Sequence, residues 1–445
     1  MRTCYRFIIV VILIVSAALM LPGQRASAEE AVVFPDISLE GAVREATGKL
    51  LGDIYESDLG NLTVLNASSK NIVDLAGLER CTALTKLDLS KNSISDISPI
   101  SNLPGLAELN LSENQIDDIT DISGLTALSR LWLEGNRIID ITPLSNLTGL
   151  TELNLWGNQI DSVTAISVLN NLDTLWIGGN QISNIAPLAS LNKLEVLSLQ
   201  KDPISDITPV SNLTGLTHLD LIAIQLVDIT PLSNLTGLAE LWLGENNISD
   251  ITALSSLESL TVLSLGGNPV EDISPLADLS KLTQLDLRAV QANDITSLTG
   301  LINLDWLNLG DNQISDISSL SNLINLSLLY LGGNQISDIK PLVENTGIGQ
   351  GDGVYLKDNP LNETSKDIYI PQLEQRGVDV LWDAPATPAP TPVPSPVTTL
   401  IPQITPIPAD SSGSGTSFNI WFVIGPVMGV LLAGGALYYL VKRRG

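Results

Sequence analysis

Leucine and isoleucine recur along most of this chain in an order that repeats every 22 residues. The register begins at Leu62 and runs without insertion or deletion through thirteen copies to Gly347. Positions 1, 4, 6, 11, 14, 17 and 20 of a copy are apolar, as in LTKLDLSKNSISDISPISNLPG at residues 84–105. Seven apolar residues are too few to bury a core within one copy, so the copies must stack into a continuous core.

Each copy predicts a strand, a turn and a short helical segment. Positions 4 to 6 alternate apolar, variable and apolar, which is typical of a half-buried strand. Position 9 is Asn in nine copies, and its amide can bond the backbone of the next coil as the chain leaves the strand. Position 13 is Asp in eleven copies, with Ser162 and Asn184 in the other two. All three residue types cap helices, so we expect a helical turn such as Ile97-Ser98-Pro99-Ile100 to follow.

The aspartate row allows a second interpretation. Stacked coils place the position-13 carboxylates in a line, where backbone N–H groups of the following turns can stabilise each charge. Calcium bridging between adjacent coils is the alternative, because calcium takes oxygen ligands. We favour capping, since Ser162 and Asn184 still cap a turn but are poorer calcium ligands.

The motif LxxLxLxxNxIxDIxPLxxLxx resembles the leucine-rich repeat, in the 22-residue class of bacterial internalin-like surface proteins. Thirteen in-phase copies over residues 62–347 make the resemblance specific. It implies an α/β solenoid, a leucine-rich-repeat horseshoe with a concave parallel β-sheet and convex short helical turns. It also implies a helical N-terminal cap over residues 29–61 and a C-terminal cap over residues 348–383.

The two flanking segments fit these caps. In the first, Leu39, Val43 and Ala46 share one helical face, and Asp36 or Ser38 can begin that helix. In the second, Val354-Tyr355-Leu356 predicts a last strand, and Asn359-Pro360-Leu361 repeats part of the motif. Internalins usually follow their repeats with an immunoglobulin-like domain, whereas this chain passes directly into a Pro-rich segment.

Both ends of the chain carry targeting features. Residues 1–28 predict a secretory signal peptide, with Arg2 and Arg6 before a short apolar stretch and Ala26-Ser27-Ala28 as the cleavage site. Residues 384–417 are rich in Pro, Thr and Ser and predict an extended stalk. Residues 418–441 are uncharged and long enough to cross a bilayer, which leaves residues 442–445 as a cytoplasmic tail.

This layout predicts a single-pass type I membrane protein at the cell surface, with an extracytoplasmic ectodomain. A hydrophobic stretch with a basic tail also occurs in signals for attachment to the envelope, but no LPxTG precedes this one, so retention in the membrane is favoured. Gly425, Gly429 and Ala433 form a small-xxx-small stripe that supports dimerisation of the span only weakly.

Charge and composition exclude several classes of partner and site. The net charge is −27, from 22 basic and 49 acidic residues. Removing six basic residues of the predicted signal peptide and tail leaves 16, and thus a net charge of −33. Such a surface excludes nucleic acid and repels anionic lipid. With one histidine, His218, and two cysteines, Cys4 and Cys81, no catalytic constellation, cofactor or metal site is predicted.

The aromatic residues suggest a binding surface. All five tryptophans of the repeats fall at positions 3, 5 or 7, which flank the inward-pointing positions 4 and 6 and therefore point out of the concave sheet. Exposed aromatic residues with polar neighbours are typical of binding interfaces, although they could also merely shield the sheet. The predicted ligand-binding residues are Trp132, Trp156, Trp176, Trp242, Trp306 and Tyr330, with Tyr355 extending the C-terminal group.

We therefore predict an adhesion or recognition protein, without enzymatic activity, that binds an extracellular protein ligand on its concave face. Acidic residues near the tryptophans favour a basic partner; they are Asp88, Glu108, Glu134 and Glu152. Polysaccharide binding is the alternative, because flat aromatic rings also stack on sugars. A third possibility is a structural spacer of the cell envelope that has no specific ligand.

Overall fold

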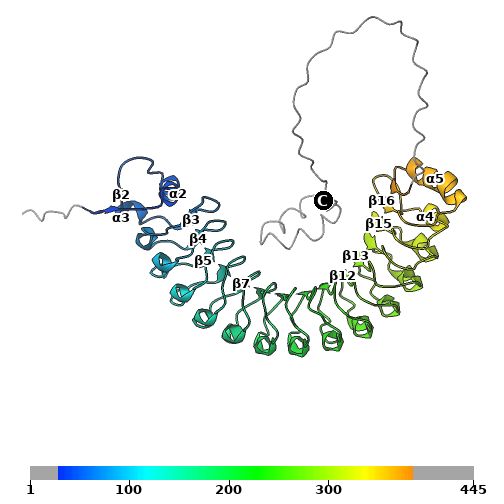
Figure 1. Cartoon of the computed structure of the whole chain (residues 1–445), viewed down its shortest axis with the longest axis horizontal. Helices are drawn as coiled ribbons and strands as arrows, with labels where there is room; N and C mark the ends of the chain where they lie inside the picture. The colour runs from blue at the N-terminus through cyan, green and yellow to red at the C-terminus, as the bar shows by residue number, and fades with distance from the viewer. Residues whose placement is uncertain (1–28, 384–445) are drawn as a thin grey trace, which may run out of the picture. The chain divides into compact units, whose positions relative to one another are not determined.

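The computed structural model describes residues 29–383, which form one curved solenoid (Figure 1). The predicted signal peptide (1–28), stalk (384–417), membrane span (418–441) and tail (442–445) lie outside the described residues and stay predictions. Within residues 29–383, no helix is long and apolar enough to cross a membrane.

A fifteen-stranded sheet lines the inner, concave side of the arc (Figure 1). Its strands follow one another in chain order, and each pairs in parallel with the next, as Leu131 does with Leu153. The strands are β3 (Val64–Asn66), β4 (Lys86–Asp88), β5 (Glu108–Asn110), β6 (Arg130–Trp132), β7 (Glu152–Asn154), β8 (Thr174–Trp176), β9 (Val196–Ser198), β10 (His218–Asp220), β11 (Glu240–Trp242), β12 (Val262–Ser264), β13 (Gln284–Asp286), β14 (Trp306–Asn308), β15 (Leu328–Tyr330), β16 (Gly353–Tyr355) and β17 (Asp379–Leu381).

The strands occupy positions 3 to 5 of each copy, one residue earlier than predicted. Leu133, at position 6, lies just past β6, yet its side chain is fully buried. Its backbone N–H still donates to the carbonyl oxygen of Asn154 at 2.8 Å, so pairing continues past the end of the regular strand. The boundary differs, but the alternation of inward and outward side chains is as predicted.

Short helical turns cover the outer, convex side of the arc (Figure 1). Most close with hydrogen bonds three residues apart, such as Ile100 N–H to Ile97 O at 3.1 Å, and are therefore 3₁₀ turns. They are Leu78–Arg80, Ser98–Ile100, Thr120–Ile122, Thr142–Asn146, Thr164–Val168, Ala186–Ser190, Thr208–Asn212, Thr230–Leu232, Thr252–Ser256, Ser274–Leu276, Thr296–Gly300 and Ser318–Asn322, with the α-helix α4 (Lys340–Glu344) in the last copy.

The core is a continuous row of leucine and isoleucine between the sheet and the convex turns. All seven apolar positions are buried in every copy, with Asn345 replacing an apolar residue at position 20 of the last copy. Cys81 holds the same position in the first copy and is also fully buried. Burial raises the pKa of its thiol to about 12, so Cys81 is an inert core residue.

The chain before the first repeat forms two short helices and a small two-stranded sheet. The helices are α2 (Ile37–Thr47) and α3 (Glu56–Leu59), and strands β1 (Ala31–Val32) and β2 (Ile54–Tyr55) pair antiparallel. Asp36 begins α2 and accepts the N–H groups of Ser38 and Leu39 at 2.9 and 3.1 Å. Its other oxygen accepts the Val73 N–H at 2.8 Å, which ties α2 to the first repeat.

The predicted apolar face of α2 is partly wrong. Leu39 and Val43 are buried as predicted, but Ala46 is exposed and Ala42 is buried instead. The face of α2 toward β3 consists of Leu39 and the residues three and four positions after it, Ala42 and Val43. Ala46 lies about one turn beyond this face.

The chain after the repeats continues the sheet for two strands. The predicted strand 354–356 corresponds to β16, but it is not the last, because β17 pairs with it in parallel. Between them lie a π-helical turn, Ser365–Tyr369, and helix α5 (Ile370–Gln375), whose Ile370 and Leu373 cover the end of the core. Leu361 is buried, and Asn359 makes the same hydrogen bonds as the repeat asparagines.

Candidate ligand-binding face

The position-9 asparagines fix the spacing of the loops beside the concave face. Asn136 accepts the backbone N–H of Ile116 at 3.0 Å and donates to the carbonyl oxygens of Leu111 and Leu133, also at 3.0 Å. Ile116 and Leu111 belong to the preceding coil, so the prediction that this amide bonds the next coil is wrong. The residue before it, at position 8, has a positive φ in all thirteen copies, and this turn directs the amide back toward the preceding coil.

Most position-13 aspartates lie one residue before the N-cap of a convex turn, one residue earlier than predicted, and accept the first backbone N–H of that turn. Asp250 accepts the backbone N–H of Thr252 at 2.8 Å and its hydroxyl at 2.6 Å, and these bonds hold the pKa of Asp250 below its usual value. Asn184 makes the equivalent bond to Ala186 at 2.9 Å, whereas Ser162 reaches Thr164 only at 3.5 Å. Over residues 29–383, no three His, Cys, Asp or Glu side chains are placed to hold a metal ion together.

Three of the predicted tryptophans gather on the concave side over β6 to β8. Trp132 and Trp176 lie in register on either side of Asn154, and Trp156 follows two residues after Asn154. With strands about 4.8 Å apart, the backbones of Trp132 and Trp176 are roughly 10 Å apart. The side chains of all three tryptophans are half-buried rather than fully exposed, so the predicted direction is confirmed but the degree of exposure is lower.

Polar partners account for part of this burial. The Trp132 indole N–H donates to Glu152 Oε1 at 3.0 Å. The Trp156 ring lies against Gly179, where a Cβ atom would come within 3.3 Å of Trp156 Cε2 and where φ is +68°. The Trp156 Nε1 atom is buried there without a hydrogen-bond partner. A glycine at position 179 therefore allows this indole to lie flat on the next coil.

Asn154 lies between Trp132 and Trp176 on the middle one of three neighbouring strands. It is 4% exposed, donates to the Glu134 carboxylate and accepts the backbone N–H of Trp156 at 3.0 Å. Burial raises the pKa of Glu134, because solvent no longer stabilises its charge as well. The three tryptophans, Asn154 and Glu134 thus form one compact surface, which we call the aromatic cluster.

Some of the acidic residues around the aromatic cluster form ion pairs with basic residues, and others do not. Arg130 lies between Glu108 at 3.3 Å and Glu152 at 3.4 Å, and Lys86 pairs with Glu108 at 2.9 Å. Glu134 is in no ion pair among the described residues, and its one hydrogen-bond partner is the neutral Asn154. Asp88 lies on β4 and bonds Ser90 at 2.7 Å, so it is the predicted acidic residue furthest along the sheet from the tryptophans.

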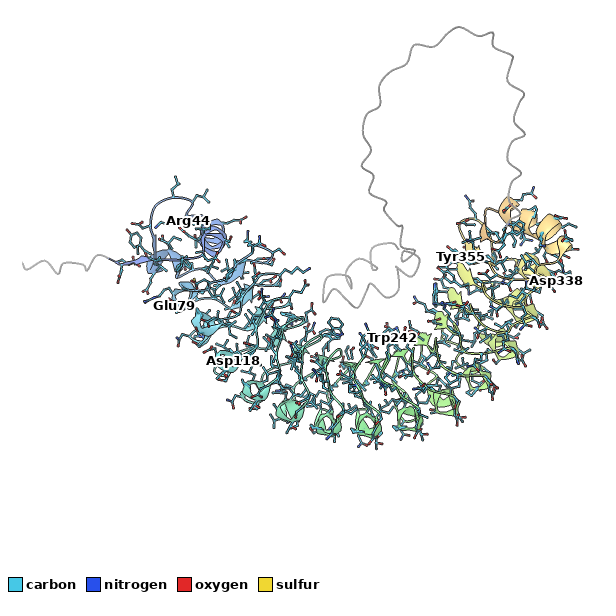
Figure 2. The ribbon with its side chains drawn as sticks, in the orientation of Figure 1. Arg44, Glu79, Asp118, Trp242, Asp338 and Tyr355 are labelled. Atoms are coloured by element: carbon cyan, nitrogen blue, oxygen red, sulfur yellow. The ribbon has the colours of Figure 1, made fainter. Side chains whose placement is uncertain are left out.

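Trp242 lies further along the concave face, in β11, where Figure 2 shows it on the inner side of the arc. Ser198 of β9 and Asp220 of β10 separate it from Trp176 in the same register. Both polar side chains are 3% exposed. Asn154, Ser198 and Asp220 are not among the predicted binding residues. The sequence contains one signal for them: they occupy position 5 in copies that lie between the copies with a tryptophan at position 5.

Trp306, Tyr330 and Tyr355 form a second aromatic group near the C-terminal end of the sheet. The rings of Trp306 and Tyr330 are 5.9 Å apart and tilted by 57°, and those of Tyr330 and Tyr355 stack 4.5 Å apart at 13°. Burial raises the pKa of Tyr330, with a smaller contribution from its neighbour Tyr355. The predicted site residues therefore form two separate groups, with Trp242 between them.

His218 has a hydroxyl and a carboxylate within reach, which the sequence did not predict. Its Nδ1 lies 2.7 Å from Thr217 Oγ1, and its Nε2 lies 3.4 Å from Glu240 Oε1. The Thr217 hydroxyl donates its proton to the Glu195 carbonyl oxygen at 3.1 Å. These contacts orient the imidazole, and which group donates between Thr217 and His218 depends on the tautomer of His218.

Two open hollows lie away from the aromatic residues. One, of about 630 Å³, lies between convex turns lined by residues from Val227 to Ser256. The other, of about 680 Å³, follows the edge of the sheet between Gly149 and Gly215. Neither of these two hollows is lined by a tryptophan or a tyrosine.

Comparison with known proteins identifies similar chains. A model of leucine-rich repeats, covering two copies at a time, matches residues 82–124, 126–168, 170–212, 258–303 and 302–344. No curated protein matches the chain. The solved structure of an internalin, InlF, from Listeria monocytogenes is 31% identical with a TM-score of 0.65, and the match covers 82% of this chain and 100% of InlF.

Two further solved structures share the fold at lower identity. A leucine-rich-repeat protein of Leptospira interrogans is 21% identical with a TM-score of 0.60, over 73% of this chain and 97% of that one. The functional domain of InlJ from Listeria monocytogenes is 22% identical with a TM-score of 0.55, over 74% of this chain and 84% of that one. At these identities the two structures support the architecture alone.

Proposed function

Because the chain belongs to the internalin-like leucine-rich-repeat proteins, we propose that it is a cell-surface recognition protein whose concave face binds a protein ligand. The observation that carries this proposal is the aromatic cluster, in which Trp132, Trp156 and Trp176 lie together on a rigid sheet. Half-buried indoles on rigid strands lose little freedom when a ligand covers them, which is a property of interface hot spots.

The charge around the aromatic cluster supports a basic ligand. Among residues 29–383, Glu134 is half-buried and belongs to no ion pair, and Glu152 has Arg130 as its one cationic partner. Burial raises the pKa of both glutamates, because loss of solvent destabilises their charged forms. A ligand cation would stabilise these charged forms. The net charge of −27 would also speed the approach of a basic partner.

The proposed location follows from the ends of the chain. The predicted signal peptide would export residues 29–383, and the predicted stalk and span would hold them outside the membrane. Protease added to intact cells should then cut within 384–417 and release the solenoid. Protection of that segment would contradict the topology.

The test of the proposed function uses the fragment 29–383, immobilised on a support. Surface proteins that bind to it are cross-linked to the fragment and identified. Once a partner is identified, the triple variant W132A/W156A/W176A should weaken its binding by at least about 30-fold, the equivalent of about 2 kcal/mol for one hot spot. Ile139→Ala, on an exposed convex side chain, is the control and should leave binding unchanged. Unchanged binding in the triple variant would contradict the proposal and favour the spacer alternative.

Polysaccharide binding is supported by one observation, the stacked pair Tyr330 and Tyr355, because flat aromatic surfaces also accept sugar rings. Charge reversal separates the two functions. Glu134→Lys should weaken a basic protein ligand strongly and a neutral polysaccharide little. Tyr330→Ala should do the opposite.

A further inference from the structure

Two tryptophans flank a buried serine and a buried aspartate on the concave face. Trp176, Ser198, Asp220 and Trp242 are paired in direct register across β8, β9, β10 and β11. They all occupy position 5, whose side chains point out of the sheet on the concave side. The other charged residues at position 5, Asp88 and Asp286, are only partly buried.

Asp220 is nevertheless only 3% exposed. Its Oδ1 accepts the backbone N–H of Ile222 at 3.1 Å, and its Oδ2 accepts the Ser198 hydroxyl at 3.1 Å. Both donors are neutral, and none of the ion pairs among the described residues involves Asp220. Burial raises the pKa of Asp220 to about 6, against a smaller opposing effect of the Lys201 charge, so above that pH the carboxylate is a buried negative charge outside the ion pairs of the described residues.

Asp286 provides an internal comparison. It holds the same repeat position and also accepts a serine hydroxyl, from Ser264 at 3.2 Å, and a backbone N–H, from Arg288 at 3.1 Å. Its register neighbours are Ser264 and Asn308, so no tryptophan lies directly beside it. Arg288 also lowers its pKa through its charge. Asp220 therefore differs from Asp286 in its adjacent tryptophan and in having no neighbouring arginine.

We propose that Trp242 and the buried carboxylate of Asp220, its direct register neighbour, form a subsite for a cationic side chain, lysine or arginine, of the protein ligand. This inference rests on the proposed function, since it assigns a chemistry to part of the same face. The faces of indole rings attract cations, most strongly where solvent is excluded. The buried carboxylate of Asp220 beside the Trp242 indole adds an attraction that solvent screens little.

The charged groups next to the subsite favour the same ligand. Glu240 lies on β11 two residues before Trp242, and it pairs with His218 of β10 at 3.4 Å. Lys201, past β9, is the one cation whose charge acts on Asp220. A ligand cation can contact the Trp242 indole without breaking the bonds of Asp220 to Ser198 and Ile222, so the subsite needs no rearrangement of the sheet.

The test is titration calorimetry of the fragment 29–383 with a tetralysine peptide at pH 8, where Asp220 is ionised. Asp220→Asn removes the charge and keeps one acceptor oxygen for the Ile222 N–H, and its NH2 group can donate to the Ser198 hydroxyl oxygen instead. It should weaken tetralysine binding by at least about fivefold. Asp286→Asn removes the same charge from the matched position without tryptophans and should change binding less than about twofold. Trp242→Leu keeps an apolar cover but removes the aromatic ring and should also weaken binding at least about fivefold.

Equal effects of Asp220→Asn and Asp286→Asn would overturn the subsite, because the attraction would then be general to the acidic surface. Absence of tetralysine binding by the wild-type fragment would overturn it as well. If circular dichroism shows that Asp220→Asn is unfolded, the test rests on Trp242→Leu, and unchanged tetralysine binding by that variant would overturn the subsite. The triple variant of the aromatic cluster is measured in parallel with the protein partner. If that variant loses partner binding while Asp220→Asn and Trp242→Leu leave tetralysine binding unchanged, the proposed function stands and the subsite alone is refuted.

Discussion

Asp202 Oδ1 accepts the backbone N–H of Asn180 at 3.1 Å, whereas its Oδ2 is buried without a hydrogen-bond partner. Asp202 stands at position 9, where Asn180 in the preceding coil donates Nδ2–H to the carbonyl oxygens of Leu155 and Ile177 at 3.1 and 2.6 Å. An ionised carboxylate cannot make such donations, but a protonated one can. Burial raises the pKa of Asp202 to about 7, which is consistent with a bound proton in the folded state.

Asp202→Asn should therefore stabilise the protein and flatten its pH dependence. The pKa of Asp202 is above the unfolded value of 3.8, so the folded state holds the proton longer as pH rises. Stability from this residue is then lost between about pH 4 and pH 7 and stays low above pH 7. At about 1.4 kcal/mol per pKa unit, the gain of the variant at pH 8 should be a few kcal/mol, measured by urea unfolding at several pH values. A variant with the same pH profile as wild type would contradict the assignment.

The reverse exchange is the matched control. Asn158→Asp places a carboxyl in the same position two coils earlier, where the amide now donates to Leu133 and Leu155 at 3.0 Å. The free energy of unfolding of this variant should fall more steeply than that of wild type as pH rises from 4 to 7, because the wild-type amide at position 158 does not titrate.

Removal of a ladder amide should be costly although the side chain is polar. Asn136→Ala leaves the Ile116 N–H and the Leu111 and Leu133 carbonyl oxygens without their partner in the interior. We expect a loss of about 2 kcal/mol or more in the free energy of unfolding. Asp118→Asn, an exposed convex substitution in the preceding coil, is the control and should change stability far less.

Trp132 and Leu131 are adjacent in β6 and should respond differently to truncation. Leu131 is fully buried, so Leu131→Ala should cost about 2–5 kcal/mol. Trp132 is half-buried with one hydrogen bond, so Trp132→Ala should cost about 1 kcal/mol and leave a cooperative melt. Thermal melting of the two variants checks this, and equal losses would mean that Trp132 is a core residue.

Tyr330 contacts an aromatic ring on each side, so its removal should affect both. Tyr330→Ala should lose about 1–2 kcal/mol, since each aromatic pair contributes about 0.5–1.5 kcal/mol beyond the buried area. Tyr330→Phe keeps both ring contacts and should be close to wild type. Near-ultraviolet circular dichroism should change with Ala and not with Phe.

The convex aspartates should behave as caps. Hydrogen bonds from Thr252 lower the pKa of Asp250, so its stabilising effect is present above the unfolded pKa and is lost as pH falls through the lower folded value. Asp250→Ala should thus reduce stability at pH 7 and less at pH 2. Removal of calcium with a chelator should leave the melting temperature unchanged; a large drop would favour the calcium alternative.

The sequence by itself determined the repeat architecture. A strict 22-residue period fixes which side chains are buried, because seven apolar positions per copy can be covered only by stacking the copies in register. The same alternation placed Trp132, Trp176 and Trp242 on the concave side, since neighbours of inward residues in a strand point outward. These are consequences of local periodicity, and a single sequence contains them in full.

The tertiary structure decided the features that depend on what a side chain meets on a neighbouring coil. The direction of the Asn136 hydrogen bonds, the burial of Asp220 between tryptophans and the unpartnered oxygen of Asp202 all arise from groups about 20 to 25 residues away in the chain. The exposure of Ala46 follows in the same way from how α2 lies against β3. Periodicity gives the face on which a residue lies, but burial and hydrogen bonding depend on the size and polarity of the side chains packed against it.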